Sequence, residues 1–129
     1  MNRYKDWIAQ AERDMEKAKL DIRHGYYDWA CFTSQQSAEK AAKALCMKLG
    51  FDAWGHSVTN TLKLLKDTLE VPEEIIEQAQ LLDTFYIPTR YPNGFSIGKP
   101  SDYYNEKIAK EALDACDKVF GFCKTNINR

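Results

Sequence analysis

The stretch GYYDWACFTSQQSAEKAAKAL, residues 25–45, decides the fold of this chain. It has the composition of a long helix, and the glycines at 25 and 50 predict that this helix runs from about Tyr26 to Leu49. One face carries mostly small side chains, which allow a second helix axis to approach closely. The members of this face are Tyr27, Cys31, Ser34, Ala38, Ala42, Leu45 and Leu49.

The opposite face of the same helix is polar but is bounded by large side chains. It carries Phe32, Gln36, Glu39, Lys40 and Lys43, with Trp29 and Met47 at its edges. If this face were simply solvated, Glu39 and Lys43 would form an i,i+4 pair worth a few tenths of a kcal/mol. Because aromatic residues flank it, we predict instead that the face is an interface or a groove, and that the helix is central, with contacts on both sides. The residues assigned to this interface or groove are Trp29, Phe32, Gln36 and Glu39.

Four further helices are expected around this one. Their expected ranges are Asn2 to Arg23 with Asn2 as N-cap, Ser57 to Leu69, a helix that begins at Pro72 and continues toward Tyr86, and a last helix from Ser101 or Asp102 to about Thr125. No useful strand pattern and no repeat interrupts them. The sequence therefore predicts an all-α, antiparallel up-and-down bundle of about five helices in one domain, residues 1–129, with one long ordered loop before the last helix.

The composition indicates a soluble protein without a strong charge bias. The net charge is -1, and no apolar run approaches the roughly 18–20 residues that cross a bilayer. The N-terminal sequence MNRYKDWIAQAERD has no apolar core of a signal peptide, so we expect a cytoplasmic protein without a membrane partner.

The four cysteines, Cys31, Cys46, Cys116 and Cys123, do not form a CxxC pair. His24 and His56 do not complete a zinc set of recognisable spacing. We expect buried, reduced thiols, no metal site and no cofactor.

The segment FYIPTRYPNGFSIGKPSDYY, residues 85–104, is the expected long loop. Pro88 and Pro92 restrict the backbone on both sides of Arg90, which lowers the entropy cost of holding this side chain. An arginine among aromatic residues suits stacking on a base and two-point contact with phosphate. The alternative is an arginine that pairs with an aspartate or glutamate and only fixes the loop. The GFSIGK sequence within the loop does not have the spacing of a phosphate-binding P-loop.

Other candidate residues lie outside the loop. His56 precedes the expected helix at residues 57–69, where a lone histidine is more often a capping or packing residue than a base. Asp14 lies at the edge of the apolar stripe of the first helix and needs a partner if it is buried.

The stretch at residues 25–45 resembles the second helix of the HEPN family. The resemblance is carried by Tyr27, Ala30, Gln36, Glu39, Lys40 and Lys43. It extends to GHSVTNTLKLL and to LDTFYIPTRYPNGF followed by SDYYNEKIAKEAL, so it covers nearly the whole chain. It implies a helical bundle that dimerises and binds nucleotides or RNA, and that is often encoded beside a minimal nucleotidyltransferase as a toxin–antitoxin pair.

Many HEPN toxins are metal-independent ribonucleases whose motif is an arginine followed a few residues later by a histidine. Arg90 matches the arginine in place and context, but no histidine follows it, since His24 and His56 both precede it. The ribonuclease motif is therefore incomplete.

The leading hypothesis is a non-catalytic or weakly catalytic homodimer that binds nucleotide or phosphate and partners a nucleotidyltransferase. In it, Arg90 holds phosphate, Tyr91 and Phe95 stack or shape the pocket, and Lys40 and Lys43 add positive charge. One alternative is a ribonuclease that uses Arg90 with Tyr91, Tyr103 or His56. The other is a non-catalytic protein-interaction module that binds through the polar face at residues 36–43.

Overall fold

The computed structural model describes residues 1–129 and consists of five α-helices and two short 3₁₀ turns. The helices are α1 (Tyr4–Arg23), α2 (Tyr27–Lys48), α3 (Val58–Lys63), α4 (Glu73–Asp83) and α5 (Glu106–Ile127), and the turns are η1 (Pro92–Gly94) and η2 (Pro100–Asp102). The predicted all-α bundle is confirmed. None of these helices combines the length and the apolar character that crossing a membrane requires.

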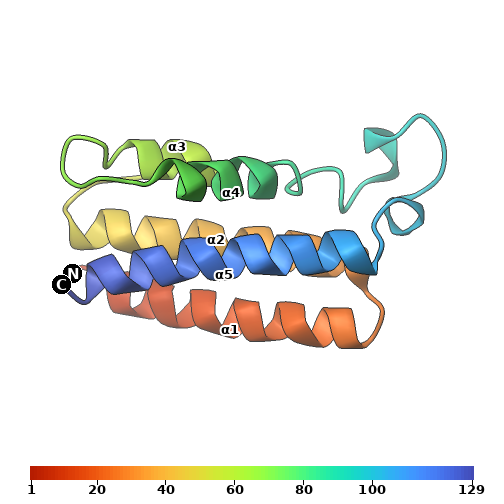
Figure 1. Ribbon diagram of the computed structural model, residues 1–129, viewed down its shortest axis with the longest axis horizontal. Helices are drawn as coiled ribbons and strands as arrows, with labels where there is room; N and C mark the ends of the chain where they lie inside the picture. Colours follow the sequence, from red (N-terminus) through yellow and green to blue (C-terminus); the bar gives the residue numbers. More distant parts are fainter.

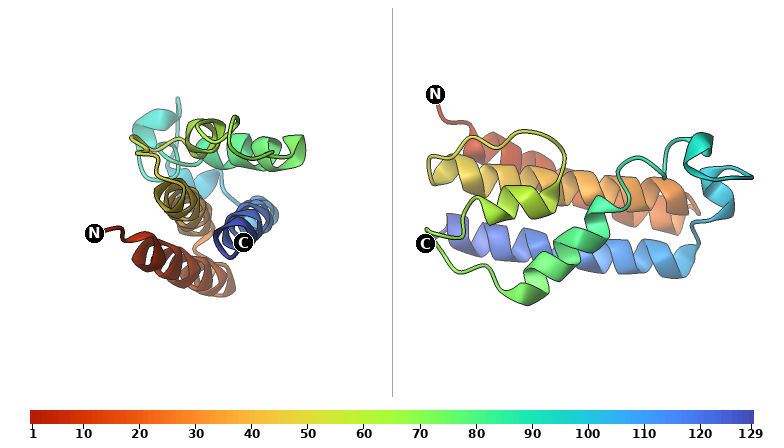
Figure 2. Two further views of the ribbon diagram at one scale, coloured as in Figure 1. Left: turned by 90° about the vertical axis from the view of Figure 1, so that its left-hand side faces the viewer. Right: turned by 90° about the horizontal axis from the view of Figure 1, so that it is seen from above.

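The helices form three layers (Figure 1). α1 lies on one side, α2 and α5 form the middle, and α3 and α4 cover the other side. α1 and α2 run antiparallel, and α4 runs opposite to α5. Viewed end-on, α1, α2 and α5 form a triangle with the α3–α4 layer against it (Figure 2).

α2 is the central helix, because it contacts α1, α3, α4 and α5. Small side chains make this possible: most of its buried residues are alanine, serine or cysteine. The hydroxyl of Ser37 donates a 2.6 Å hydrogen bond to the backbone carbonyl of Ala11 in α1. Gly50 has a φ of 85° just after α2, where a glycine is favoured. The predicted central position of this helix is confirmed.

Three predicted helix boundaries are wrong, and local hydrogen bonds explain the differences. α1 begins at Tyr4, although Asn2 Oδ1 still accepts a hydrogen bond from the Tyr4 N–H (3.0 Å). The α-helical part of α3 ends at Lys63, six residues before the predicted Leu69. Beyond it the bonds tighten to i→i+3, as from Leu65 N to Leu62 O at 3.0 Å. This tighter turn places both leucines in the core.

The start of α5 is the third difference. The helix begins at Glu106 because Asn105 is its N-cap: the backbone there is extended, and its side chain accepts from the Ile108 N–H at 2.9 Å. Pro100 instead opens the separate turn η2. Tyr104 therefore lies outside the helix. Its ring packs edge-on against that of Phe85, with the ring centroids 6.1 Å apart.

The four cysteines are buried free thiols, as predicted. Burial raises the pKa of Cys31 to about 12, of Cys46 to about 11 and of Cys116 to about 12, and raises the pKa of Cys123 as well. A thiolate in this environment would lose its hydration without gaining a positive partner. These thiols are core side chains.

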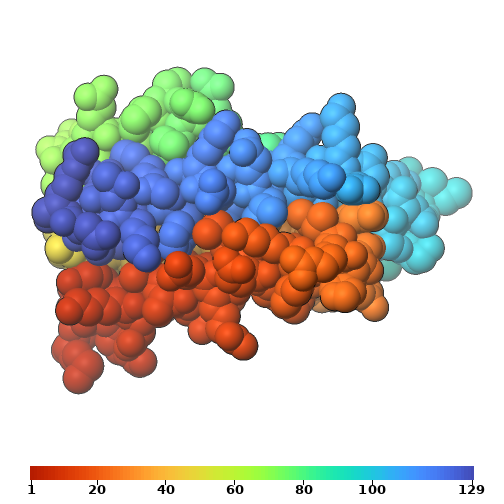
Figure 3. Space-filling model, turned by 60° about the horizontal axis from the view of Figure 1, so that its bottom comes forward, coloured from red at the N-terminus to blue at the C-terminus, as the bar shows by residue number.

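The loop between α4 and α5 forms one end of the molecule and extends beyond the helices (Figure 3). It folds back on itself, since a Cβ at Gly94 would lie 3.3 Å from the Cα of Pro88. The loop therefore packs against itself between Pro88 and Gly94. Its first half lies near the α3–α4 layer, and this is where the candidate site forms.

Candidate functional site

Asp83, the last residue of α4, holds the start of α3. Its carboxylate accepts hydrogen bonds from Ser57 Oγ (2.9 Å) and from the N–H groups of Val58 (2.7 Å) and Thr59 (3.2 Å). The two N–H groups lie in the first turn of a helix, where a negative charge is favourable. This connection fixes His56, just before α3, beside the residues that follow α4.

Tyr86 is the residue that His56 meets there. The two rings stack with centroids 4.5 Å apart and an angle of 16° between their planes. The ring of Phe32 from α2 lies 6.1 Å from the same tyrosine. The guanidinium carbon of Arg90 lies 4.7 Å from the Tyr86 ring centroid. Tyr86 thus brings together residues from α2, from the segment before α3 and from the loop.

The Arg90 side chain is held by a hydrogen bond at Nε and by contacts with neighbouring aromatic rings. Its Nε donates a 2.9 Å hydrogen bond to the backbone carbonyl of Tyr86. The guanidinium carbon also lies 4.3 Å from the ring centroid of Phe32 and 5.1 Å from that of Tyr91. None of the ion pairs of the chain includes Arg90. The two terminal NH₂ groups therefore have no acidic partner, in contrast to the alternative in which Arg90 only pairs with a carboxylate.

Glu39 is the charged group that α2 buries on this side, with a side chain only 6% exposed. Its Oε2 receives Lys43 Nζ at 3.2 Å, and its Oε1 lies 3.1 Å from His56 Nδ1 and 3.2 Å from Gln35 Nε2. Both carboxylate oxygens are therefore partnered, as a buried charge requires. The same carboxylate connects α2 to the segment that carries His56.

Two glutamines extend this network. Gln36 Nε2 donates to Gln35 Oε1 at 2.7 Å, which fixes the orientation of the Gln35 amide. Gln35 Nε2 then faces both Glu39 and the backbone carbonyl of His56, the latter at 3.0 Å. His56 is consequently held at its carbonyl, at its Nδ1 and by its stacked ring.

The two lysines predicted to add positive charge each face a carboxylate. Lys40 Nζ lies 2.5 Å from Asp14 Oδ2 in α1, which is the partner that Asp14 was expected to need. Lys43 pairs with Glu39 and lies 5.9 Å from the ring centroid of Trp7. Their participation in phosphate binding stays a prediction.

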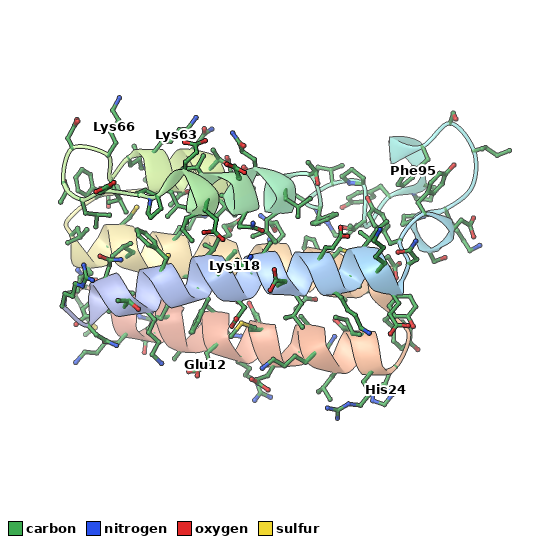
Figure 4. The ribbon with its side chains drawn as sticks, viewed as in Figure 1. Glu12, His24, Lys63, Lys66, Phe95 and Lys118 are labelled. Carbon is green, nitrogen blue, oxygen red and sulfur yellow. The ribbon has the colours of Figure 1, made fainter.

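The two predicted pocket aromatics lie in different surroundings. Tyr91 contacts the Arg90 guanidinium, as described above. Phe95 stacks on Tyr103, with centroids 4.0 Å apart, and meets the edge of Tyr104 at 6.1 Å. Figure 4 shows Phe95 in the outer part of the loop. Its aromatic partners thus belong to the segment that leads into α5, and no aromatic or cation–π contact joins it to Arg90.

Trp29, the remaining residue of the predicted interface, lies next to this cluster. Trp29 is 46% exposed and meets the edge of Phe32 with centroids 6.1 Å apart. Tyr91 is also exposed, at 47%. Arg90 therefore lies in a patch whose aromatic rings are in part open to solvent.

Comparison with known proteins identifies the family. The HEPN domain model matches residues 4–126, almost the full chain. This protein belongs to the HEPN family. The match agrees with the resemblance noted in α2, in the segment around α3 and in the loop.

Solved structures of similar proteins agree with this assignment. TT1696 from Thermus thermophilus is 41% identical with a TM-score of 0.95, covering 98% of this chain and 99% of that chain. The archaeal HEPN homologue ST0689 is 40% identical with a TM-score of 0.84, covering 98% and 99%. The HEPN domain protein TM0613 from Thermotoga maritima is 36% identical with a TM-score of 0.78, covering 96% and 98%.

One relative has a name that describes a function. The "Putative toxin MJ1304" of Methanocaldococcus jannaschii is 25% identical over 127 residues, which cover 92% of this chain and 84% of that protein.

Sequence reasoning missed the role of Tyr86, and it named His56 beside Arg90 only as one alternative, without a reason for their proximity. The sequence names Tyr86 only as the residue toward which the fourth helix continues, whereas its ring stacks on His56 and its carbonyl accepts a hydrogen bond from Arg90 Nε. His56 comes before Arg90 in the chain, so the spacing of the family motif, which lies downstream of the arginine, gives no reason to place it in the site. The sequence feature that could have indicated the position of His56 is Asp83, an acidic residue at a helix end that can cap the start of another helix.

Proposed function

We propose that this protein binds the phosphate groups of a nucleotide or an RNA at Arg90, and that it partners a minimal nucleotidyltransferase in a toxin–antitoxin-like pair. The proposal rests on the way the Arg90 side chain is held. Its Nε is bonded to a backbone carbonyl, while its terminal NH₂ groups have no acidic partner. A guanidinium held in this way offers two parallel donors to a phosphate without a further loss of side-chain freedom.

The aromatic rings around Arg90 support a nucleotide rather than a simple anion. Phe32, Tyr86 and Tyr91 surround the guanidinium, and Tyr91 is exposed at 47%. Stacking of a base on an aromatic side chain contributes roughly 1–3 kcal/mol. Because Lys40 and Lys43 each have a carboxylate partner, we assign the main positive charge of the site to Arg90.

Calorimetric titration with ATP, AMP and inorganic phosphate tests the binding. Charge-assisted hydrogen bonds contribute roughly 1.5–3 kcal/mol each, so Arg90→Ala should weaken nucleotide binding about tenfold to a hundredfold. Arg90→Lys should restore little, because an ammonium lacks the planar fork. Arg13→Ala, which removes an exposed arginine of α1, is the matched control and should bind like the parent.

Two results would contradict this proposal. The first is nucleotide binding by Arg90→Ala that equals that of the parent. The second is the absence of binding of any of the three ligands at millimolar concentration, which would leave the interaction module as the remaining hypothesis. Co-purification with a nucleotidyltransferase encoded next to this protein tests the partner independently.

The proposed assembly is a two-fold homodimer. Several large apolar side chains are exposed near the α1–α2 connection, including Leu20 at 44%, Tyr26 at 59% and Trp29 at 46%. They line one shallow depression with Lys17, Asp21 and His24. Closed two-fold dimers are the commonest soluble oligomers. Light scattering at tens of micromolar should give the dimer mass, and a monomer mass would exclude this assembly.

A further inference from the structure

A groove of about 700 Å³ lies between the second half of α5 and the segment that leads into α4. Figure 1 shows that this half of α5 lies away from the loop that carries Arg90. We propose that the groove is a docking site for a basic, amphipathic α-helix of a partner protein. It is separate from the site at Arg90, so the proposal does not depend on phosphate binding there.

The groove contains a glycine that the packing of this chain does not require. Gly121 lies in the interior of α5, where glycine is the poorest helix former after proline. Its φ is not among the positive values of the chain, so the backbone does not need a glycine here. A Cβ at this position would meet nothing within 4 Å, so no neighbouring atom needs the space either. The missing side chain leaves room for a backbone from outside this chain to approach α5 closely.

Hydrophobic side chains lie in the groove together with this glycine. Leu69, Ile75 and Phe122 pack against the core and are each in part open to solvent. The remaining residues that line the groove are charged or polar, apart from Gly121 and one proline. Pockets for small molecules, by contrast, are lined predominantly by apolar side chains. A segment of a protein with an apolar face and polar edges therefore fits the groove better than a small ligand.

The α4 side of the groove is strongly acidic. Residues 67–89 contain six carboxylates and no lysine, arginine or histidine, although the whole chain has a net charge of only -1. Four glutamates of this segment are exposed: Glu70, Glu73, Glu74 and Glu77. Of these, only Glu74 has a basic partner, at 3.6 Å from Lys118 Nζ. Charge complementarity therefore requires a basic edge on the occupant of the groove.

The walls of the groove favour a helical occupant. This chain has no β-strand, so it offers no sheet edge to an extended peptide. Proline-rich segments bind grooves lined by aromatic rings, and Phe122 is the only aromatic residue in this groove. The lining residues of α5 extend from Asp117 to Asn126 and beyond, which is at least about 14 Å along the helix axis. Roughly ten residues of a partner helix can therefore lie against α5.

A second copy of this chain fits the groove less well. α1 forms the outer layer opposite α3 and α4, so it is the helix most available to another copy (Figure 1). Two of its lysines are already paired within the same helix: Lys17 Nζ lies 2.5 Å from Asp21, and Lys19 Nζ lies 3.0 Å from Glu16. A partner helix with unpaired lysines or arginines therefore gains more from the acidic segment than α1 does.

Fluorescence anisotropy with two labelled helical peptides tests the docking site. The first peptide has leucine and alanine on one face and lysines along its edges, and the second has glutamates in place of the lysines. The full-length protein should bind the lysine peptide at least about tenfold more tightly, and added salt should weaken this binding. Equal binding of the two peptides, or no binding of the lysine peptide at millimolar concentration, would overturn the proposal.

Gly121→Leu separates occupation of the groove from attraction to a charged surface. The added side chain blocks close approach to α5, so binding of the lysine peptide should weaken at least about tenfold. The melting temperature should rise, because leucine is a better helix former than glycine, so the loss of binding cannot come from unfolding. Ala9→Leu, at an exposed position of α1, is the matched control and should bind the peptide like the parent. Unchanged binding by Gly121→Leu would show that charge alone attracts the peptide, and would overturn the docking site.

A pair of substitutions tests the acidic side of the groove. Glu70→Gln with Glu74→Gln removes two exposed carboxylates and should weaken binding of the lysine peptide about threefold to tenfold. Glu106→Gln with Glu111→Gln removes two exposed carboxylates from the first half of α5 and should change the affinity by less than about twofold. Equal effects of the two pairs would contradict a basic edge that lies against α4.

Light scattering distinguishes a partner helix from a second copy of this chain. Gly121→Leu should have the same molecular mass as the parent, because the groove is open to a partner in both. A dimeric parent with a monomeric Gly121→Leu would assign the groove to a second copy and would overturn the partner helix. None of these substitutions changes Arg90, so the outcomes leave the proposed phosphate binding to its own test.

Discussion

α2 has one side made of small side chains and another made of charged and amide side chains, and both are buried. On the small-residue side, Ala38 and Ala42 are fully inaccessible to solvent. The polar side, with Gln35, Glu39 and Lys43, is held by hydrogen bonds and ion pairs. α2 is therefore central for two reasons: its small-residue side permits close approach of other helices, and its polar side fixes the segment before α3.

Substitutions on the two sides of α2 should destabilise the protein for different reasons. The small-residue side has no spare volume, so it should be sensitive to added atoms and to charge. The polar side is fully partnered, so it should be sensitive to the loss of one partner.

The largest effect should be alkaline destabilisation through the buried thiols. At pH 7 the thiols are almost entirely protonated in both states, so they contribute almost no pH dependence. Above about pH 9 the unfolded thiols ionise, whereas burial raises the pKa of Cys31 to about 12 and of Cys46 to about 11 in the folded state. The folded state then binds more protons, and stability falls with rising pH by about 1.4 kcal/mol per pH unit for each thiol.

Urea unfolding between pH 7 and pH 10 under reducing conditions measures this slope. Cys31→Ala should show a shallower fall, because one of the four thiols no longer contributes. Other groups that titrate at alkaline pH are the same in both proteins, so their contribution cancels. Equal slopes for the two proteins would show that this thiol is not protected by the core.

The second effect should follow from removing Glu39 alone. Glu39→Ala leaves the Lys43 ammonium, whose side chain is 11% exposed, without its carboxylate. Loss of one partner of a buried ion pair costs about 3–5 kcal/mol. Urea unfolding at pH 7 should show this loss, and adding Lys43→Met to the variant should recover most of it. No recovery in the double variant would mean that Glu39 acts mainly through His56 and Gln35.

A third effect should arise from added volume on the small-residue side. Ala42→Leu should destabilise the protein by about 1–3 kcal/mol, because Ala42 is fully buried where other helices pack against α2. Ala9→Leu makes the same change at an exposed position of α1 and should shift the free energy of unfolding by less than about 0.5 kcal/mol. Equal effects at the two positions would refute the close-approach argument.

Much of the contrast between the two sides of α2 could be predicted from the sequence. The helical period of residues 25–45 predicts both sides of α2, and the resemblance in the same stretch predicts the family. Of the three wrong boundaries, those of α3 and α5 lie where a local signal competes with the helical period. Asn105 caps α5 more effectively than Ser101 or Asp102, and this depends on an extended backbone at residue 105 that the apolar stripe does not reveal.

The site was predictable only in part. Arg90 and its rigid surroundings follow from the prolines and aromatics of the loop. The proximity of His56 does not, because it depends on Asp83 capping a helix that begins 25 residues earlier in the chain. Phe95 and Arg90 are close in the sequence, but the loop folds back between them, so the stacking partner of Phe95 is Tyr103. Residue order along a loop is a poor guide to its internal contacts.

The smallest effect concerns a second ion pair at the edge of the polar side. Lys40 and Asp14 lie closer together, at 2.5 Å, than Lys43 and Glu39, at 3.2 Å. Their side chains are, however, more exposed, at 27% and 16% against 11% and 6%. Since water screens the attraction of partly exposed charges, burial rather than distance should decide the coupling energy.

Double-mutant cycles with Lys→Met and an acid→amide change measure both couplings by urea unfolding. We expect about 1 kcal/mol or less for Asp14 with Lys40, and several times more for Glu39 with Lys43. Raising the ionic strength from about 0.05 to about 0.5 M (about 14 to 4 Å in Debye length) should reduce the first coupling and leave the second nearly unchanged. If the shorter pair has the larger coupling, the buried polar side of α2 is not held by its desolvated charges, and the cause must lie in the hydrogen bonds of Gln35 and His56.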